Sequence, residues 1–230
     1  CADLDLDGND EVIVSVSGYS ELETGKDATL FIIWGNGDIL EKKEIGKGYY
    51  MSPVAFGDID GDKFPEVVTV SPYDEDGDAY LHVFNMDGTE VEGWPKKVDH
   101  LIGGADGVVN AKLAVGDVLG DGKIDIVMYS RGTLSVLNNK QGTRVAMKFP
   151  SESYAPDVIK APIIDDVDGD GSNDVVVAVG NKVYVFDFSL LGDAELVHWA
   201  GYKGGDLRTG RYDACSDGYF LDYTDDEKHG

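Results

Sequence analysis

Four segments of this chain repeat one arrangement of acidic residues, and each runs directly into an apolar stretch. Acidic side chains occupy positions 1, 3, 5 and 9 of each segment, except that Leu119 stands at position 3 of the third. The segments are residues 3–11, 58–66, 117–125 and 166–174, and their starts are separated by 55, 59 and 49 residues. Periods of this size are typical of solenoids, propellers and other repeat arrays. The repeat therefore restricts the possible folds more than any other feature of the sequence.

The residues between the acidic segments have the pattern of short β-strands. Runs rich in Val, Ile, Tyr and Phe are bounded by Gly, Asn and Asp, and glycine accounts for 30 of the 230 residues, which indicates many tight turns. We predict an all-β fold, a β-propeller of about four blades, each a four-stranded antiparallel sheet. The expected strands are residues 53–56, 66–71, 80–85 and 90–94 in the second unit, 112–115, 124–130, 134–138 and 144–149 in the third, and 161–164, 175–179, 182–186 and 195–199 in the fourth.

The propeller repeats are expected to occupy residues 1–200, followed by a C-terminal tail, residues 201–230. The expected units are about 1–50, 51–107, 108–157 and 158–200. The first unit is incomplete, because Cys1 aligns with Phe56, Val115 and Ile164, the apolar residues two places before the first aspartate of the other segments. We therefore predict that Cys1 is a small buried residue of a strand. A disulfide bond between Cys1 and Cys215 is an open alternative, since sequence does not supply the geometry that such a bond needs.

The formal net charge of −25 disfavours nucleic acid and anionic membranes as partners, because both would be repelled. A hydrophobic content of 42% argues against disorder. No run of eighteen apolar residues is present, so no membrane-spanning helix is predicted. Bound cations that neutralise the carboxylates account best for so acidic a chain.

The acidic segments have the composition of calcium-binding loops. Calcium takes six to eight hard oxygen ligands on a flexible loop, whereas magnesium demands a tighter octahedron and keeps its waters. Positions 1, 3 and 5 can supply side chains, position 7 a backbone carbonyl and position 9 a last carboxylate. An EF-hand would need Glu at position 12 and flanking helices. Position 12 is instead occupied by Val14, Thr69, Met128 and Val177, so the EF-hand is excluded.

We predict three calcium sites and a weaker fourth. The alternative is that all four segments are solvated Asp-Gly turns. The third loop is expected to bind weakly or not at all, because Leu119 replaces a carboxylate. The predicted ligands are Asp3, Asp5, Asp7, Asn9 and Glu11 in the first loop; Asp58, Asp60, Asp62, Phe64 and Glu66 in the second; Asp117, Asp121, Lys123 and Asp125 in the third; and Asp166, Asp168, Asp170, Ser172 and Asp174 in the fourth.

The acidic loops with their apolar followers, together with residues 87–95 (DGTEVEGWP), resemble the FG-GAP family in its VCBS-like bacterial form. The same repeat forms the propeller of integrin α subunits. The resemblance implies calcium ions on one face of the propeller, between the first and second strands of each blade, and ligand binding on the opposite face. Propellers of this family usually close with seven blades. The chain is then either a fragment of a larger propeller or a four-bladed ring closed by residues 212–223.

On the face opposite the ions, the connecting loops would present aromatic and imidazole rings that could stack on sugars or grip a protein. The alternative is that these rings fill gaps between blades with their polar atoms in water. The candidate ligand-binding residues are Tyr19, Tyr49, Tyr50, Tyr73, His100 and Tyr154.

No catalytic residue is predicted, since the four histidines are scattered and no Gly-x-Ser-x-Gly motif is present. We expect an extracellular or cell-surface, non-catalytic module that binds glycan or protein ligands, as in carbohydrate binding and cell adhesion. The alternatives are part of a secreted polysaccharide lyase or hydrolase, and a structural spacer. Calcium sites of extracellular modules have dissociation constants of about 10⁻⁴–10⁻³ M, so they would stand empty in the cytosol.

Overall fold

A computed structural model describes residues 1–16, 27–47, 54–71, 78–98, 111–130, 133–137, 144–148, 161–179, 181–188 and 197–199. These residues form fifteen strands in four antiparallel sheets and contain no helix. The prediction of an all-β fold built from antiparallel sheets is therefore confirmed. The described part of the chain therefore has no helix that could cross a membrane.

Each sheet is built mainly from strands that are consecutive in the chain. The first contains β1 (Val12–Val16), β2 (Asp27–Ile33) and β3 (Ile39–Lys47), in that order. The second contains β4 (Ala55–Gly57), β5 (Glu66–Val70), β6 (Tyr80–Phe84) and β7 (Lys96–Lys97). The third has the order β11-β10-β9-β8-β15 and contains β8 (Lys112–Gly116), β9 (Asp125–Ser130), β10 (Thr133–Leu137), β11 (Arg144–Lys148) and β15 (Val197–Trp199). The fourth contains β12 (Ile163–Asp165), β13 (Asp174–Val179) and β14 (Lys182–Asp187).

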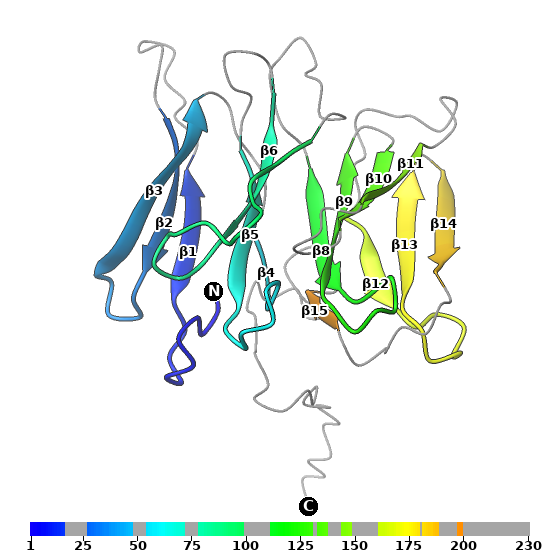
Figure 1. The fold of residues 1–230 in the computed structure, drawn as a ribbon, viewed down its shortest axis with the longest axis horizontal. Coiled ribbons are helices and arrows are strands. Elements are labelled where there is room, and N and C mark those ends of the chain that lie inside the picture. Colours follow the sequence, from blue (N-terminus) through cyan, green and yellow to red (C-terminus); the bar gives the residue numbers. More distant parts are fainter. Residues whose placement is uncertain are drawn as a thin grey trace, which may run out of the picture.

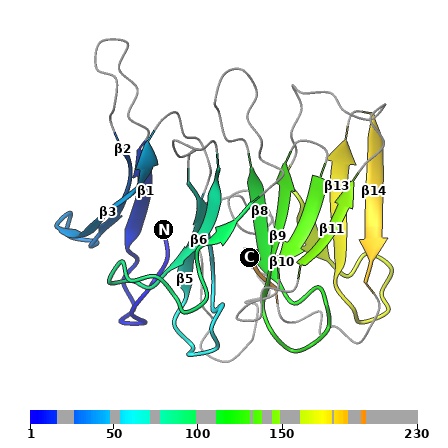
Figure 2. The same ribbon diagram turned by 45° about the horizontal axis from the view of Figure 1, so that its top comes forward.

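The four sheets stand in a row in chain order, with the first and the fourth at opposite ends (Figure 1; Figure 2). Strand β4 lies against β8, and β8 lies against β12, so the first strands of neighbouring sheets are in contact. The four acidic loops all lie at the same end of the sheets, the lower end in Figure 1. Over the described residues the row does not close on itself, and the proposed ring-closing residues 212–223 lie outside this part of the chain.

The core consists of layers between the sheets, and the third sheet is buried on both faces. In β9, Ile126 and Met128 belong to the apolar cluster shared with the first two sheets. Val127 and Tyr129, on the opposite face, belong to the cluster shared with the fourth sheet. Because successive residues of a strand point to opposite faces, a strand covered on both sides needs apolar residues throughout. This explains why the apolar run after the third acidic loop has no polar break.

Strand β15 corrects the predicted fourth strand of the fourth unit. Residues 195–199 were expected to continue the fourth sheet beside residues 182–186. Instead, Val197 pairs with Gly116 of β8, at the edge of the third sheet. Strand β8 pairs with β9 on one side, and β15 pairs with the backbone groups on its other side, which no other strand of the third sheet uses. The repeat pattern in the sequence does not specify with which unpaired sheet edge the last strand, β15, forms its hydrogen bonds.

The outer strand of the second sheet is also displaced from its prediction. Residues 90–94 were expected to form it, but Glu90 makes only an isolated bridge to Phe84. The chain then turns, with the backbone N–H of Trp94 donating to the carbonyl of Val91 at 3.1 Å. The paired strand β7 begins only at Lys96.

Cys1 is partly exposed rather than buried. Ala2 pairs with Glu11 in an antiparallel bridge, so Cys1 lies opposite Val12 on the outer face of the first sheet. Its counterparts Phe56, Val115 and Ile164 are buried because a preceding sheet covers them. The predicted bond to Cys215 is not tested, since Cys215 lies outside the described residues.

Candidate metal centre

Each acidic loop connects the first two antiparallel strands of a sheet. In the second sheet the loop runs from the end of β4 to the start of β5, and the third and fourth sheets repeat this arrangement with β8 and β9 and with β12 and β13. In the first sheet the bridge between Ala2 and Glu11 takes the place of the first strand. The strand pair fixes the distance between the two ends of every loop.

The backbone is left-handed at positions 4 and 6 of every loop. Gly169 and Gly171 have φ values of 77° and 87° in the fourth loop. Most side chains avoid this region, which is why glycine recurs at these positions. Two other residues adopt it here: Leu6, with φ 59°, and Lys63, with φ 81°. These two left-handed residues have a single residue between them. Together they make the chain curve back around its own acidic side chains.

The aspartate at position 1 organises each loop by accepting backbone hydrogen bonds. In the fourth loop Asp166 accepts from the N–H groups of Gly169, Asp170 and Gly171, at 2.7, 3.1 and 3.0 Å. The corresponding residues of the other loops, Asp3, Asp58 and Asp117, likewise accept from backbone N–H groups at positions 4 to 6.

The aspartates at positions 3 and 5 each accept a hydrogen bond from the N–H group two residues further on. Asp168 accepts from Asp170 at 3.2 Å, and Asp170 accepts from Ser172 at 2.8 Å. The third loop has Leu119 at position 3 and lacks the first of these bonds. In both aspartates the oxygen that accepts this bond is Oδ1.

The acidic residue at position 9 is buried in every loop, whereas at position 1 only Asp117 of the third loop is buried. One oxygen of Glu66 accepts from the backbone N–H of Ile59 at 2.6 Å, and one oxygen of Asp125 accepts from Val118 and Leu119 at 3.1 and 3.0 Å. Glu11 and Asp125 have 0% exposed surface, and their second oxygens, Oε1 and Oδ1, are buried without a hydrogen-bond partner. A buried carboxylate oxygen without a donor costs free energy, and a cation would supply the missing partner.

Burial raises the pKa of all four carboxyl groups at position 9. Burial is the largest cause, and the nearby aspartates of the same loop add to it; the pKa of Glu66 is raised to about 8 and that of Asp125 to about 7. The pKa values of Glu11 and Asp174 are raised for the same reasons. Hydrogen bonds from the backbone oppose the shift in every case. These groups therefore carry negative charge at a free-energy cost that a bound cation would remove.

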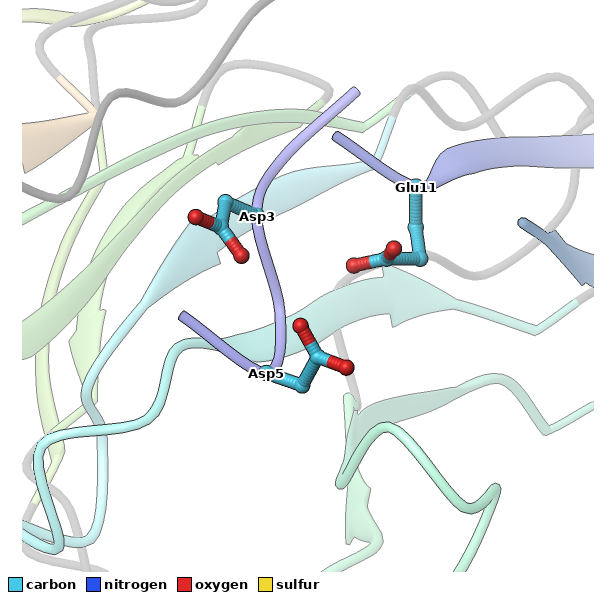
Figure 3. Close-up of side chains that lie close together, drawn as sticks. All are labelled: Asp3, Asp5 and Glu11. Carbon is cyan, nitrogen blue, oxygen red and sulfur yellow. The ribbon is translucent and has the colours of Figure 1, made fainter. Parts of the chain in front are cut away.

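Carboxylates from three of the four loops come together in the way a metal ion needs. The grouped oxygen atoms lie within 4.8 Å of one another, and Figure 3 shows Asp3, Asp5 and Glu11 around a common space. Among the residues that the structure describes, the third loop contributes no such group. The groups are Asp3, Asp5 and Glu11; Asp58, Asp60 and Asp62; and Asp166, Asp168 and Asp174.

Several predicted ligands lie in the loops but outside these groups. Among the predicted carboxylate ligands of the first and second loops, Asp7 and Glu66 are the two that the groups do not include. Position 7 is occupied by Asn9, Phe64, Lys123 and Ser172, whose carbonyl groups stay predicted ligands.

One acidic residue near the fourth loop was missed by the sequence interpretation. Asp187, at the end of β14, forms a further group with Asp168 and Asp170. The register of the hairpin places Asp187 opposite Asp174. The predicted strands at residues 175–179 and 182–186 are joined by only two residues. A hairpin this short sets the register, and that register would have indicated that Asp187 lies opposite Asp174.

The donor set fits a hard divalent cation. Every grouped ligand is a carboxylate oxygen, the donor type that calcium prefers, and the loops also offer backbone carbonyls. Clustered carboxylates repel one another unless a cation lies among them. Glu11, whose Oε1 is buried without a hydrogen-bond partner, is a member of one of these clusters. The first, second and fourth loops are therefore candidate metal centres, and the ion would join the first two strands of each sheet.

The predicted ligand-binding rings are not tested by the structure. Tyr19, Tyr49, Tyr50, Tyr73, His100 and Tyr154 all lie outside the described residues. They stay predictions.

These features define an all-β repeat protein in which each sheet carries an acidic loop between its first two strands. The chain belongs to the FG-GAP-like repeat family: the family model matches residues 3–69 and 58–128, which together span more than half of the chain. The resemblance inferred from the acidic loops is therefore confirmed.

Comparison with other proteins adds a distant structural similarity. No curated protein sequence matches the chain. Among solved structures, the biofilm matrix protein Bap1 of V. cholerae is similar, with 18% sequence identity and a TM-score of 0.39. The match covers 86% of this chain and 37% of that one, so the chain spans little more than a third of the Bap1 chain.

Proposed function

We propose that this chain is an extracellular, calcium-stabilised binding module of the adhesion type, without catalytic activity of its own. The observation that carries the proposal is the recurrence of one carboxylate cluster at the same end of three sheets. Membership of the FG-GAP-like repeat family supports it. The calcium ions would hold the loops, and the connections at the opposite end of the sheets would be left to contact a glycan or protein ligand.

The role of the ion would be structural. In the first loop it would lie among Asp3, Asp5 and Glu11 and offset their mutual repulsion. It would also supply a partner to the buried Oε1 of Glu11. Because the ion binds the folded state only, its binding free energy adds to the stability of the sheets.

Calcium titration by calorimetry after chelation tests the metal part of the proposal. We expect saturable calcium binding at about three sites, with dissociation constants of about 10⁻⁴–10⁻³ M, and much weaker magnesium binding. Asp168→Ala should remove one site. Asp38→Asn is the matched control, because Asp38 is an exposed aspartate of a hairpin turn outside the acidic loops. Titrations without calcium binding, or with equal losses in both variants, would contradict the proposal.

A glycan array and a pull-down from matrix extracts, both with calcium-loaded protein, test the ligand part. We expect binding that is lost on chelation and weakened by Tyr73→Ala or Tyr154→Ala, while the melting temperature of these variants stays near that of the wild type. If no glycan or protein binds, the binding function is wrong and the chain is a structural spacer. If polysaccharides are cleaved with new reducing ends or unsaturated products, the chain belongs to an enzyme.

A further inference from the structure

The turn between β2 and β3 carries Asn36 and Gly37, and Asn36 is the one asparagine of the sequence that is followed by glycine. Both residues are exposed. Beyond its chain neighbours, no atom lies within 4 Å of the place where a Cβ of Gly37 would stand. Gly37 is left-handed, with φ 93°, a conformation that favours glycine. Solvent therefore reaches this pair of residues.

The side chain of Asn36 is folded back onto the turn by two hydrogen bonds with Asp38. The backbone N–H of Asp38 donates to Oδ1 of Asn36 at 2.9 Å, and Nδ2 of Asn36 donates to Oδ2 of Asp38 at 2.9 Å. A side-chain oxygen that accepts from the N–H group two residues further on forms an Asx turn. In an Asx turn the carboxamide lies alongside the intervening peptide group, whose nitrogen here belongs to Gly37. The turn therefore holds Cγ of Asn36 beside a nitrogen that can attack it.

We propose that Asn36 is a site of spontaneous deamidation. The nitrogen of Gly37 forms a bond to Cγ of Asn36, and the bond between Cγ and Nδ2 breaks. The side-chain nitrogen leaves as ammonia, which includes the proton that the peptide nitrogen loses, and a cyclic imide remains. Water then opens the ring at either of its carbonyl groups and gives aspartate or isoaspartate. No oxidant or reductant takes part.

The geometry of the turn favours this reaction at Asn36. Because glycine has no Cβ, the residue that follows Asn36 does not hinder closure of the ring. The Asx turn holds the two reacting groups together before they react. The N–H group of Asp38 points at Oδ1, where negative charge develops as the nitrogen adds to Cγ, and a donor in that place stabilises the charge.

One hydrogen bond of the turn opposes the reaction. The N–H of Gly37 donates to the carbonyl of Trp34 at 2.8 Å, so this bond must open before the nitrogen can attack. The turn is exposed at residues 35–38, and exposed turns open locally at a small cost in free energy compared with unfolding of a sheet. The reaction therefore proceeds from the folded protein.

Deamidation changes the charge and the backbone next to the first acidic loop. Either product places a carboxylate beside that of Asp38, which then loses the donor Nδ2 of Asn36. Isoaspartate also inserts the side-chain methylene carbon into the main chain of the turn. The turn lies at the same end of the first sheet as its acidic loop, and a Cβ on Gly35 would stand 3.4 Å from the carbonyl oxygen of Asp10 (Figure 1).

Peptide mapping by mass spectrometry, after incubation of the whole folded protein at neutral and mildly alkaline pH, measures the reaction at each asparagine. We expect loss of the Asn36 peptide and formation of two products, each with the mass increase of an amide converted to an acid. An isoaspartyl methyltransferase should label one of them. The rate should rise with pH, because the attacking nitrogen must lose its proton.

Asn181 is the matched internal control. It is exposed in the turn between β13 and β14, but Lys182 follows it instead of glycine. It should stay intact while Asn36 is converted. Asn36→Gln, whose longer side chain must close a larger ring, should stop the appearance of the more acidic protein and leave the melting temperature near that of the wild type.

Several outcomes would overturn the inference. If Asn36 stays intact in the folded protein, the inference is wrong, and conversion of the same residue in urea would then show that the bond from Gly37 to Trp34 protects it. Equal conversion at Asn36 and Asn181 would show that the turn does not direct the reaction. A more acidic protein that still forms in Asn36→Gln would place the modification elsewhere.

Discussion

The side-chain amide of Asn173 donates a hydrogen bond to the backbone carbonyl of Asp117, at a distance of 2.8 Å. Both residues are buried, and they belong to acidic loops of different sheets. The position of Asn173 is occupied by Asp10, Pro65 and Ile124 in the other loops, so this bond is particular to the fourth repeat. The bond joins the third and fourth loops. Its acceptor, Asp117, is also the residue whose side chain accepts the backbone hydrogen bonds of the third loop.

Replacing Asn173 should destabilise the protein. Asn173→Ala removes the donor and leaves the buried carbonyl of Asp117 without this partner, which costs about 1–3 kcal/mol. The measurement is the free energy of unfolding from urea denaturation. Asn181→Ala, in an exposed turn, should change that free energy little. Equal effects of the two substitutions would show that the bond between the loops contributes nothing to stability.

Calcium removal should lower the melting temperature, and the loops should differ in their contribution. At a calcium concentration one hundred times the dissociation constant, each site adds about 2.7 kcal/mol to the free energy of unfolding. Asp168→Ala should abolish one such contribution, because Asp168 belongs to a carboxylate group. Asp121→Ala should have a smaller effect, since its loop has Leu119 at position 3. Scanning calorimetry of both variants, in calcium and in chelator, measures how much of the calcium-dependent stability each substitution removes. Equal losses in Asp168→Ala and Asp121→Ala would contradict the expected order of the two loops.

The stability of the calcium-free protein should fall as pH rises. The pKa of Glu66 is raised from 4.5 to about 8, so the folded state binds this proton more tightly than the unfolded state. The resulting stabilisation is complete below about pH 4.5 and is lost as pH rises to about 8. Urea denaturation in chelator should show this fall relative to Glu66→Gln, which cannot titrate. Saturating calcium should reduce this difference, because a cation held among Asp58, Asp60 and Asp62 would favour the charged form of the nearby Glu66 carboxyl group. Parallel pH profiles in chelator would refute the assignment.

The left-handed positions should respond to substitution with opposite signs. Gly171 has φ 87° and open space where a Cβ would stand, so Gly171→Ala costs only the backbone strain, a net loss of about 1 kcal/mol. Lys63 has φ 81°, and Lys63→Gly should raise the free energy of unfolding by up to about 1 kcal/mol. Gly35→Ala is the control, because Gly35 is not left-handed. Chemical denaturation of the three variants tests the signs.

The strands next to the acidic loops could be predicted closely from sequence. The predicted residues 66–71 and 175–179 correspond to β5 (Glu66–Val70) and β13 (Asp174–Val179). Both follow an acidic loop and carry an uninterrupted apolar run, so their type and start are specified locally. The destination of β15 could not be predicted, because pairing with β8 depends on which strand edge is open after the sheets have packed.

The candidate metal centres were predictable for the same local reason. Asp166, Asp168 and Asp174 come together because one short loop carries all three. Asp187 and Asn173 were missed because their contributions depend on the β13–β14 register and on the packing of one sheet against the next.

The pairing of β15 with β8 changes how the repeats depend on one another. Simple repeat arrays lose stability roughly one unit at a time, because each unit touches only its neighbours. Here the chain leaves the third sheet, forms the whole fourth sheet and then returns to the third. The fourth repeat is thus nested within the sequence of the third, and a truncation before residue 197 would strip a neighbour of its edge strand. We expect these two repeats to fold and unfold as a single cooperative unit.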